Sequence, residues 1–93
     1  MHIELTCNDL HAVTESHGGE LISLLDANGV EYIWGGIAPY WSGRNPVLFP
    51  IVGRLRDGMT RFDGNTYEMA QHGFARNQEF SVVEQTAERV VLN

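Results

Sequence analysis

Residues that favour tight turns divide this chain into short β-prone runs. Asn-Gly and Asp-Gly pairs accept positive φ at low cost, so each predicts a β-hairpin where it separates two apolar runs. No stretch shows apolar residues sustained at the i, i+3, i+4, i+7 spacing of an amphipathic helix, so we expect little or no helix. The four predicted turns fall at Asn8-Asp9, Asn28-Gly29, Asp63-Gly64 and Thr86-Ala87.

Each predicted turn lies between two runs that we expect to be strands. The strand pairs are residues 2–7 with 10–15, 20–25 with 30–34, 59–62 with 66–69, and 80–85 with 88–93. Because consecutive strands joined by hairpins pair antiparallel, the sequence predicts an all-β, antiparallel fold. The last run ends in Val90-Val91-Leu92, which is apolar and β-prone, so we expect exposed strand edges and a homo-oligomer formed through them.

The chain has 93 residues, which suits a single small β domain with little stability of its own. Its hydrophobic content of 43% predicts a folded protein, and its net charge of −6 makes nucleic acid an unsuitable partner. The first ten residues lack the apolar run of a signal peptide, and no stretch is apolar enough to span a membrane. We therefore expect a cytoplasmic protein with no membrane partner.

The segment from Gly35 to Gly58 is predicted to be irregular. It contains all three prolines and several glycines, and a long irregular segment in a compact domain is usually functional or disordered. Its large apolar residues, such as Trp41 and Phe49, favour packing over disorder.

All six basic residues are arginines, and the chain has no lysine. In an extended chain Arg54 and Arg56 share one face, and His72, Phe74 and Arg76 share another. Guanidinium groups donate in pairs to hydroxyl, carboxylate or phosphate oxygens, and aromatic rings pack on the apolar faces of sugars. These residue types therefore predict a surface that binds a polyhydroxylated or anionic small molecule.

Structural roles are the alternative for several of these residues, and for Arg56 a structural role is the favoured one. Arg56 can pair with Asp57 or Asp63 on the surface, and His72 before Gly73 can be a structural histidine at a bend. A histidine without a partner carboxylate is an incomplete acid–base catalyst. The residues alone thus predict a binding surface and no reaction.

Three consecutive stretches carry a resemblance to a known family: GELISLLDANGVEYIWGG, PYWSGRNPVLFPIVGRLRDG and FDGNTYEMAQHGFARNQEF. This ordered set, from Gly19 to Phe80, resembles the amino-terminal portion of the aldose 1-epimerase (galactose mutarotase-like) family. The resemblance implies an antiparallel β-sandwich that is part of a β-supersandwich. It also implies an isomerase that interconverts the α and β anomers of an aldose or hexose phosphate, by acid–base chemistry without a metal or organic cofactor.

The resemblance assigns expected roles to individual residues. Arg54 matches the arginine of the family's glycine–arginine stretch, and His72 matches a sugar-contacting histidine. Arg44 and Arg76 match arginines that face the phosphate in the hexose-6-phosphate mutarotase branch. Phe49 belongs to the loop that shapes the pocket. The expected partner is therefore a sugar or a sugar phosphate.

Two departures from the family pattern limit these expectations. The stretch GRLRDG is shorter than in the galactose mutarotases, so Arg56 has no clear counterpart there. The family's catalytic histidine and glutamate lie further along the chain than Asn93, so we assign no catalytic residue and expect this chain alone to be inactive. We expect residues 1–93 to be the amino-terminal part of a longer domain of this family. The alternatives are a non-catalytic carbohydrate-binding β module, dimerising through its open edge, and a structural β domain without a ligand.

Overall fold

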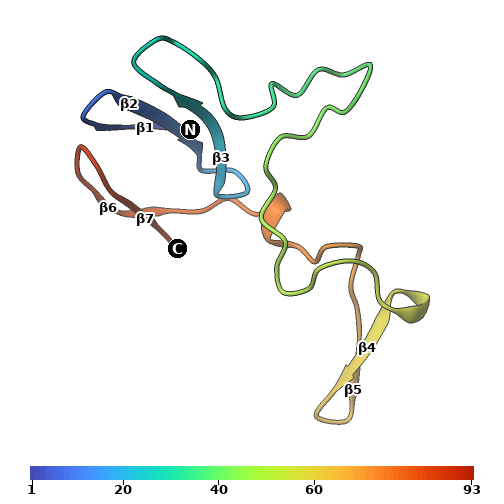
Figure 1. Ribbon diagram of the computed structural model, residues 1–93. Coiled ribbons are helices and arrows are strands. Elements are labelled where there is room, and N and C mark those ends of the chain that lie inside the picture. Colours follow the sequence, from blue (N-terminus) through green and yellow to red (C-terminus); the bar gives the residue numbers. More distant parts are fainter.

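The computed structural model describes all of residues 1–93 as an antiparallel, all-β chain (Figure 1). Seven strands form one three-stranded sheet, β1-β2-β3, and two hairpins, β4-β5 and β6-β7. Two short 3₁₀ turns are the only helical elements, as the sequence predicts. The elements are β1 (His2–Cys7), β2 (Leu10–Glu15), β3 (Glu20–Leu25), η1 (Arg56–Gly58), β4 (Met59–Phe62), β5 (Asn65–Glu68), η2 (Ala75–Asn77), β6 (Val82–Gln85) and β7 (Val90–Leu92).

The three-stranded sheet confirms the first predicted hairpin. Strand β1 pairs with β2 from His2–Glu15 to Cys7–Leu10, and Asn8 adopts a φ of 52° in the tight turn between them. Strand β2 then pairs antiparallel with β3, with a register shift between Val13 and Thr14. Contrary to the usual burial of a lone cysteine, Cys7 is exposed at the end of β1.

The second predicted hairpin forms only its turn, so the strand expected over residues 30–34 is wrong. Asp26 and Val30 close the turn around Gly29, but beyond it only an isolated Leu25–Glu31 bridge remains. The Glu31 carboxylate accepts the backbone N–H of Leu24 at 2.7 Å and that of Ile33 at 2.9 Å. A side chain that takes up backbone donors in this way competes with a strand ladder.

The two later hairpins are confirmed, with ends that differ by a residue or two. Strand β4 pairs with β5 around Asp63 (φ 48°) and Gly64 (φ 76°), and β6 pairs with β7. The segment 35–58 is irregular up to η1, as predicted. It runs from the β1-β2-β3 sheet to the β4-β5 hairpin, at opposite ends of the molecule (Figure 1).

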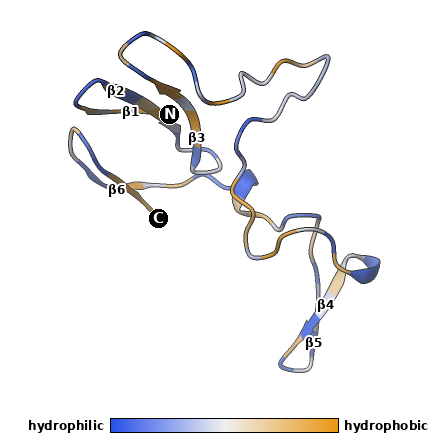
Figure 2. Ribbon diagram, viewed as in Figure 1, coloured by the Kyte–Doolittle hydropathy of each residue, from blue (hydrophilic) through white to orange (hydrophobic).

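The chain has almost no core of its own. Only 6 of its 93 residues are buried, and among the large hydrophobics only Ile3 is. Its radius of gyration is 16.2 Å, against about 12 Å for a compact domain of this length. Its accessible surface is 6802 Å², against roughly 5,400 Å² for a compact protein of this mass. Apolar residues are spread along strands and loops alike (Figure 2), so these elements do not bury one another.

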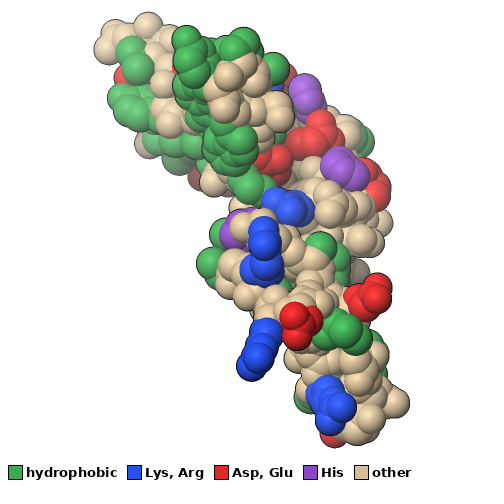
Figure 3. All heavy atoms as spheres, turned by 90° about the vertical axis from the view of Figure 1, so that its right-hand side faces the viewer, with side chains coloured by type: hydrophobic (Ala, Val, Ile, Leu, Met, Phe, Trp, Pro, Cys, Tyr) green, Lys and Arg blue, Asp and Glu red, His purple; other side chains and the backbone are tan.

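Large exposed apolar side chains occur along the whole chain, from Met1 to Val83. Some of them form a broad apolar patch at the upper end of the face drawn in Figure 3. The exposed residues that follow β3 in the sequence include Val30, Tyr32, Ile37 and Tyr40, of which Tyr40 is 82% exposed. No helix in the structure has the length and hydrophobicity needed to cross a membrane.

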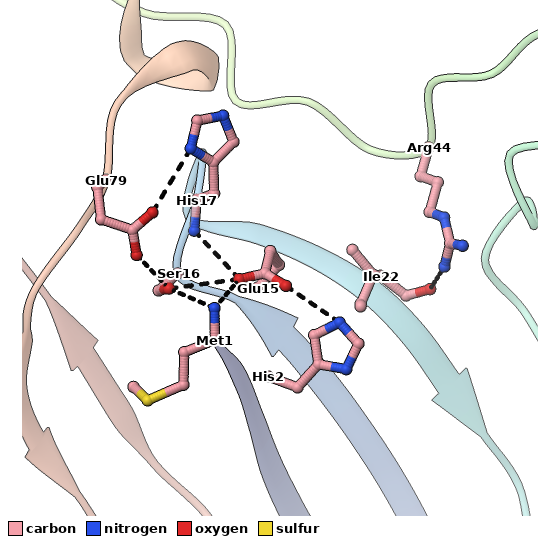
Figure 4. Close-up of polar contacts among 8 residues, drawn as sticks. All are labelled: Met1, His2, Glu15, Ser16, His17, Ile22, Arg44 and Glu79. Atoms are coloured by element: carbon pink, nitrogen blue, oxygen red, sulfur yellow. Dashed lines mark hydrogen bonds and ion pairs between the residues drawn. The ribbon is translucent and has the colours of Figure 1, made fainter.

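A polar junction ties the end of β2 to the segment that follows η2 (Figure 4). The buried Ser16 hydroxyl bonds to Glu79 at 2.5 Å and accepts from the Met1 ammonium at 2.9 Å. The same ammonium donates to the Glu15 carboxylate, and this bond lowers the pKa of Glu15 to about 2. Backbone bonds between residues 16–18 and 78–80 complete the junction, which fixes the segment after Arg76 against the sheet.

Candidate functional site

The two stretches that carry the sequence motifs meet through their backbones. Phe49 and Gly73 form a parallel bridge, and the Phe49 carbonyl accepts the N–H of Phe74 at 2.9 Å and of Ala75 at 3.2 Å. Gly73 has a φ of 72°, and a Cβ on it would lie 2.2 Å from the Phe49 oxygen. Only glycine fits this position, both for its backbone angle and for the closeness of the other chain.

The same contact fixes the His72 side chain. The His72 N–H donates to the Gly53 carbonyl at 2.8 Å, and the Gly53 N–H donates to His72 Nδ1 at 2.9 Å. Because Nδ1 accepts a hydrogen bond, the neutral ring carries its proton on Nε2. His72 therefore presents an N–H donor on the side of the ring away from Gly53.

His72 lines a cavity of about 470 Å³ between the two stretches. This volume is within the range of about 300–1,000 Å³ that is typical of small-molecule sites. The polar lining comes from Arg44, Asn45, Gln71, His72 and Arg76, and the remaining lining from Trp41, Pro46 and Leu48. None of these side chains is a carboxylate, so the cavity lining is basic and neutral in character.

Arg44 and Arg76 each use part of the guanidinium to brace the backbone. Arg44 Nη1 donates to the Ile22 carbonyl of β3 at 3.3 Å (Figure 4), and Arg76 Nη2 donates to the Gln71 carbonyl at 3.0 Å. A guanidinium has five N–H donors, so most of them stay available at the cavity. Neither arginine forms an ion pair with a carboxylate of the chain.

Of the five site residues predicted from the sequence, the structure brings Arg44, His72 and Arg76 into one cavity and leaves two outside its lining. Arg54 lies beside it, with Nη2 3.5 Å from Gln71 Oε1. Phe49 packs edge-on against Phe74, with ring centroids 6.5 Å apart. Phe49 therefore supports the loop through its backbone carbonyl and its ring.

The expected extended conformation of residues 72–76 is wrong. His72 has a φ of 65° and Gly73 a φ of 72°, and η2 begins at Ala75, so the segment is a turn. His72 and Arg76 reach the same cavity through this turn, while Phe74 does not line it. Residues 54–56 are likewise not a continuous extended run, because η1 begins at Arg56 and Asp57 has a φ of 56°.

The sequence predicted no site role for five of the lining residues: Trp41, Asn45, Pro46, Leu48 and Gln71. Asn45 and Gln71 directly neighbour the predicted site residues Arg44 and His72. Their adjacency is the only signal that could have identified them. Trp41 was expected to pack, and nothing in the local sequence indicates that its side chain reaches the cavity.

Comparisons with known proteins cover at least 90% of the chain. The family described as aldose 1-epimerase matches residues 1–93. Two curated relatives, the plasmid and chromosomal forms of Protein LacX from Lactococcus lactis subsp. lactis, are each 37% identical over 89 residues, covering 90% of this chain. The match covers 30% of their own length, so the chain spans about a third of these relatives.

Solved structures match nearly all of this chain, and the match again covers about a third of their own length. A galactose mutarotase related enzyme from Lactobacillus acidophilus is 38% identical with a TM-score of 0.93, over 99% of this chain and 31% of its own. A galactose mutarotase-like protein from Lactobacillus casei is 33% identical with a TM-score of 0.93, and the match covers 99% of this chain and 32% of its own. The Slr1438 protein from Synechocystis shares the fold, with a TM-score of 0.77 and 21% identity. The match covers 95% of this chain and 33% of its own. Since the family match spans every residue of the chain, this protein belongs to the aldose 1-epimerase family.

Proposed function

We propose that this chain carries the sugar-binding part of an isomerase that interconverts the α and β anomers of an aldose or a hexose phosphate. The observation that carries the proposal is the convergence of Arg44, His72 and Arg76 on one cavity from distant parts of the sequence. Three groups that donate hydrogen bonds suit a ligand rich in oxygen acceptors. Membership of the aldose 1-epimerase family supplies the reaction type.

Anomer exchange requires a base that removes the proton of the anomeric hydroxyl and an acid that protonates the ring oxygen. The ring then opens, the aldehyde end rotates, and closure gives the other anomer. Within residues 1–93 the cavity offers donors that hold the sugar and no carboxylate that could act as the base. We therefore assign binding and orientation to this chain and place the acid–base pair outside it.

We further propose that residues 1–93 are the amino-terminal third of a larger β domain. With 6 buried residues and an extended shape, the chain leaves most of its apolar side chains in water. Such surfaces are normally covered by further structure. The curated relatives, of which the chain spans 30%, have the length to supply it. The reading frame tests this directly, since a downstream histidine and glutamate support the enzyme and a stop codon after Asn93 contradicts it.

A second candidate is a non-catalytic carbohydrate-binding module. The absence of carboxylates from the cavity lining favours it for the chain taken by itself. Catalysed anomer exchange by the complete protein, measured by polarimetry on a panel of aldoses and hexose 6-phosphates, supports the isomerase. Sugar binding without any catalysed exchange supports the module instead.

Arg76 tests whether the ligand is phosphorylated. Charge-assisted hydrogen bonds contribute about 1.5–3 kcal/mol, so in the complete protein Arg76→Ala should weaken a hexose 6-phosphate by roughly ten- to a hundred-fold. The free hexose should lose far less. Arg76→Lys keeps the charge and loses the planar fork, so it shows whether paired donation matters.

Arg61→Ala is the matched control, because Arg61 is an exposed arginine of β4 outside this cavity. Calorimetry should find its affinities unchanged for both ligands. Equal losses for the phosphorylated and free hexose in Arg76→Ala would mean that Arg76 only braces the Gln71 carbonyl.

A further inference from the structure

Trp41 is the largest apolar side chain in the cavity lining. Its neighbours in the lining are the polar side chains described above, together with Pro46 and Leu48. Trp41 is 52% exposed, so much of the indole is open to a ligand. The cavity therefore combines one broad aromatic ring with several hydrogen-bond donors.

The position of Trp41 is fixed by contacts on both its backbone and its ring. Its N–H donates to the Ile37 carbonyl at 3.0 Å, and its carbonyl accepts the indole N–H of Trp34 at 2.8 Å. Gly43 lies against the ring: a Cβ on Gly43 would be 2.6 Å from Cζ2, 2.7 Å from Cε2 and 2.9 Å from Nε1. The indole thus occupies the space that any other residue at position 43 would need.

The adjacent aromatic residue is placed differently. Tyr40 is 82% exposed, packs edge-on against Trp34 with ring centroids 6.3 Å apart, and does not line the cavity. Two neighbouring aromatic residues therefore have distinct environments, and only Trp41 faces the groups that suit a sugar.

We propose that Trp41 is a stacking platform for the C–H face of a pyranose ring, held in place by Gly43. This inference rests on the proposed sugar-binding function. A pyranose has an apolar C–H face and a rim of hydroxyl groups, and an aromatic ring packs against the apolar face. The donors of Arg44, His72 and Arg76 then take the hydroxyl oxygens, so one ligand satisfies both kinds of lining.

The test compares four variants of the complete protein by calorimetry with D-glucose, D-galactose and glucose 6-phosphate. Trp41→Ala should weaken the sugar that binds best by about tenfold or more. Trp41→Phe keeps an aromatic face and should lose only a few-fold. Gly43→Ala leaves the indole intact but displaces it, and should reproduce most of the Trp41→Ala loss. Tyr40→Ala, the matched control, should bind as the unaltered protein does.

A second measurement is made on the unaltered protein and uses only the conservative Trp41→Phe variant, for assignment. The indole N–H resonance of Trp41, identified as the one missing in Trp41→Phe, should shift in the unaltered protein when the sugar is added. Unchanged affinity in Trp41→Ala, or an indole resonance that stays in place at saturating sugar, overturns the proposal. If the unaltered protein binds none of the three sugars, the proposed function fails first and the platform fails with it.

Discussion

Gly73→Ala is the sharpest test of how the candidate site is held together. The added Cβ would lie 2.2 Å from the Phe49 carbonyl oxygen and 2.5 Å from its carbon, in place of the separation of about 3.5 Å at normal contact. Both atoms belong to the backbone, so no side-chain rotation relieves the overlap. The two segments of the contact therefore have to move apart.

The expected cost has two parts. Alanine at a φ of 72° costs about 1–2 kcal/mol by itself. Separating these segments also weakens the two hydrogen bonds that the Phe49 carbonyl accepts, from Phe74 and Ala75. Each such bond contributes about 0.5–1.5 kcal/mol, so Gly73→Ala should cost about 2–5 kcal/mol in the complete protein.

Gly64→Ala is the control for the backbone angle. Gly64 has a φ of 76° in the turn between β4 and β5, and an added Cβ there meets no atom within 4 Å. This variant should therefore cost only the angular strain of about 1–2 kcal/mol. Urea denaturation followed by circular dichroism measures both free energies of unfolding. Equal losses in the two variants would refute the argument that the approach of Phe49 requires glycine at position 73.

Three other predictions concern different parts of the molecule. His72→Asn keeps an acceptor for the Gly53 N–H, so it should retain stability. Its sugar affinity, measured by calorimetry, should fall. His72→Gln keeps a donor toward the cavity but loses that acceptor, so urea denaturation should show a loss of about 1–3 kcal/mol in the free energy of unfolding. The pKa of Glu15 is about 2, below its ordinary 4.5, so its stabilising contribution is present above pH 4.5 and is lost as the pH falls towards 2. The difference in stability between Glu15→Gln and the unaltered protein should shrink over that range, and a constant difference would contradict the assigned ion pair. Residues 1–93 expressed alone should show no catalysed anomer exchange by polarimetry and should self-associate in sedimentation, and a compact monomer would contradict the exposed apolar surface.

Local turn chemistry made most strands predictable. Asn8-Asp9 and Asp63-Gly64 reverse the chain because Asn8, Asp63 and Gly64 adopt positive φ, which these residue types tolerate. The hairpins they close need only neighbouring residues in the sequence. The turn at Gly29 formed for the same reason, but the strand expected after it did not, because Glu31 took up the backbone donor of Leu24. Such a side-chain contact leaves no periodic signal.

The sequence by itself therefore determined an antiparallel all-β chain with an irregular middle, and its ordered motifs indicated the aldose 1-epimerase family. Only the tertiary structure decided which of the site residues predicted from the sequence meet in the cavity. Alternation along an extended chain placed Phe74 with His72 and Arg76, but the positive φ of His72 and Gly73 turns Phe74 away from the cavity. That conformation follows from the approach of Phe49, more than twenty residues earlier, whose carbonyl excludes a Cβ at position 73. Turns depend on the backbone preferences of adjacent residues, whereas a binding cavity depends on contacts between segments that no local pattern records.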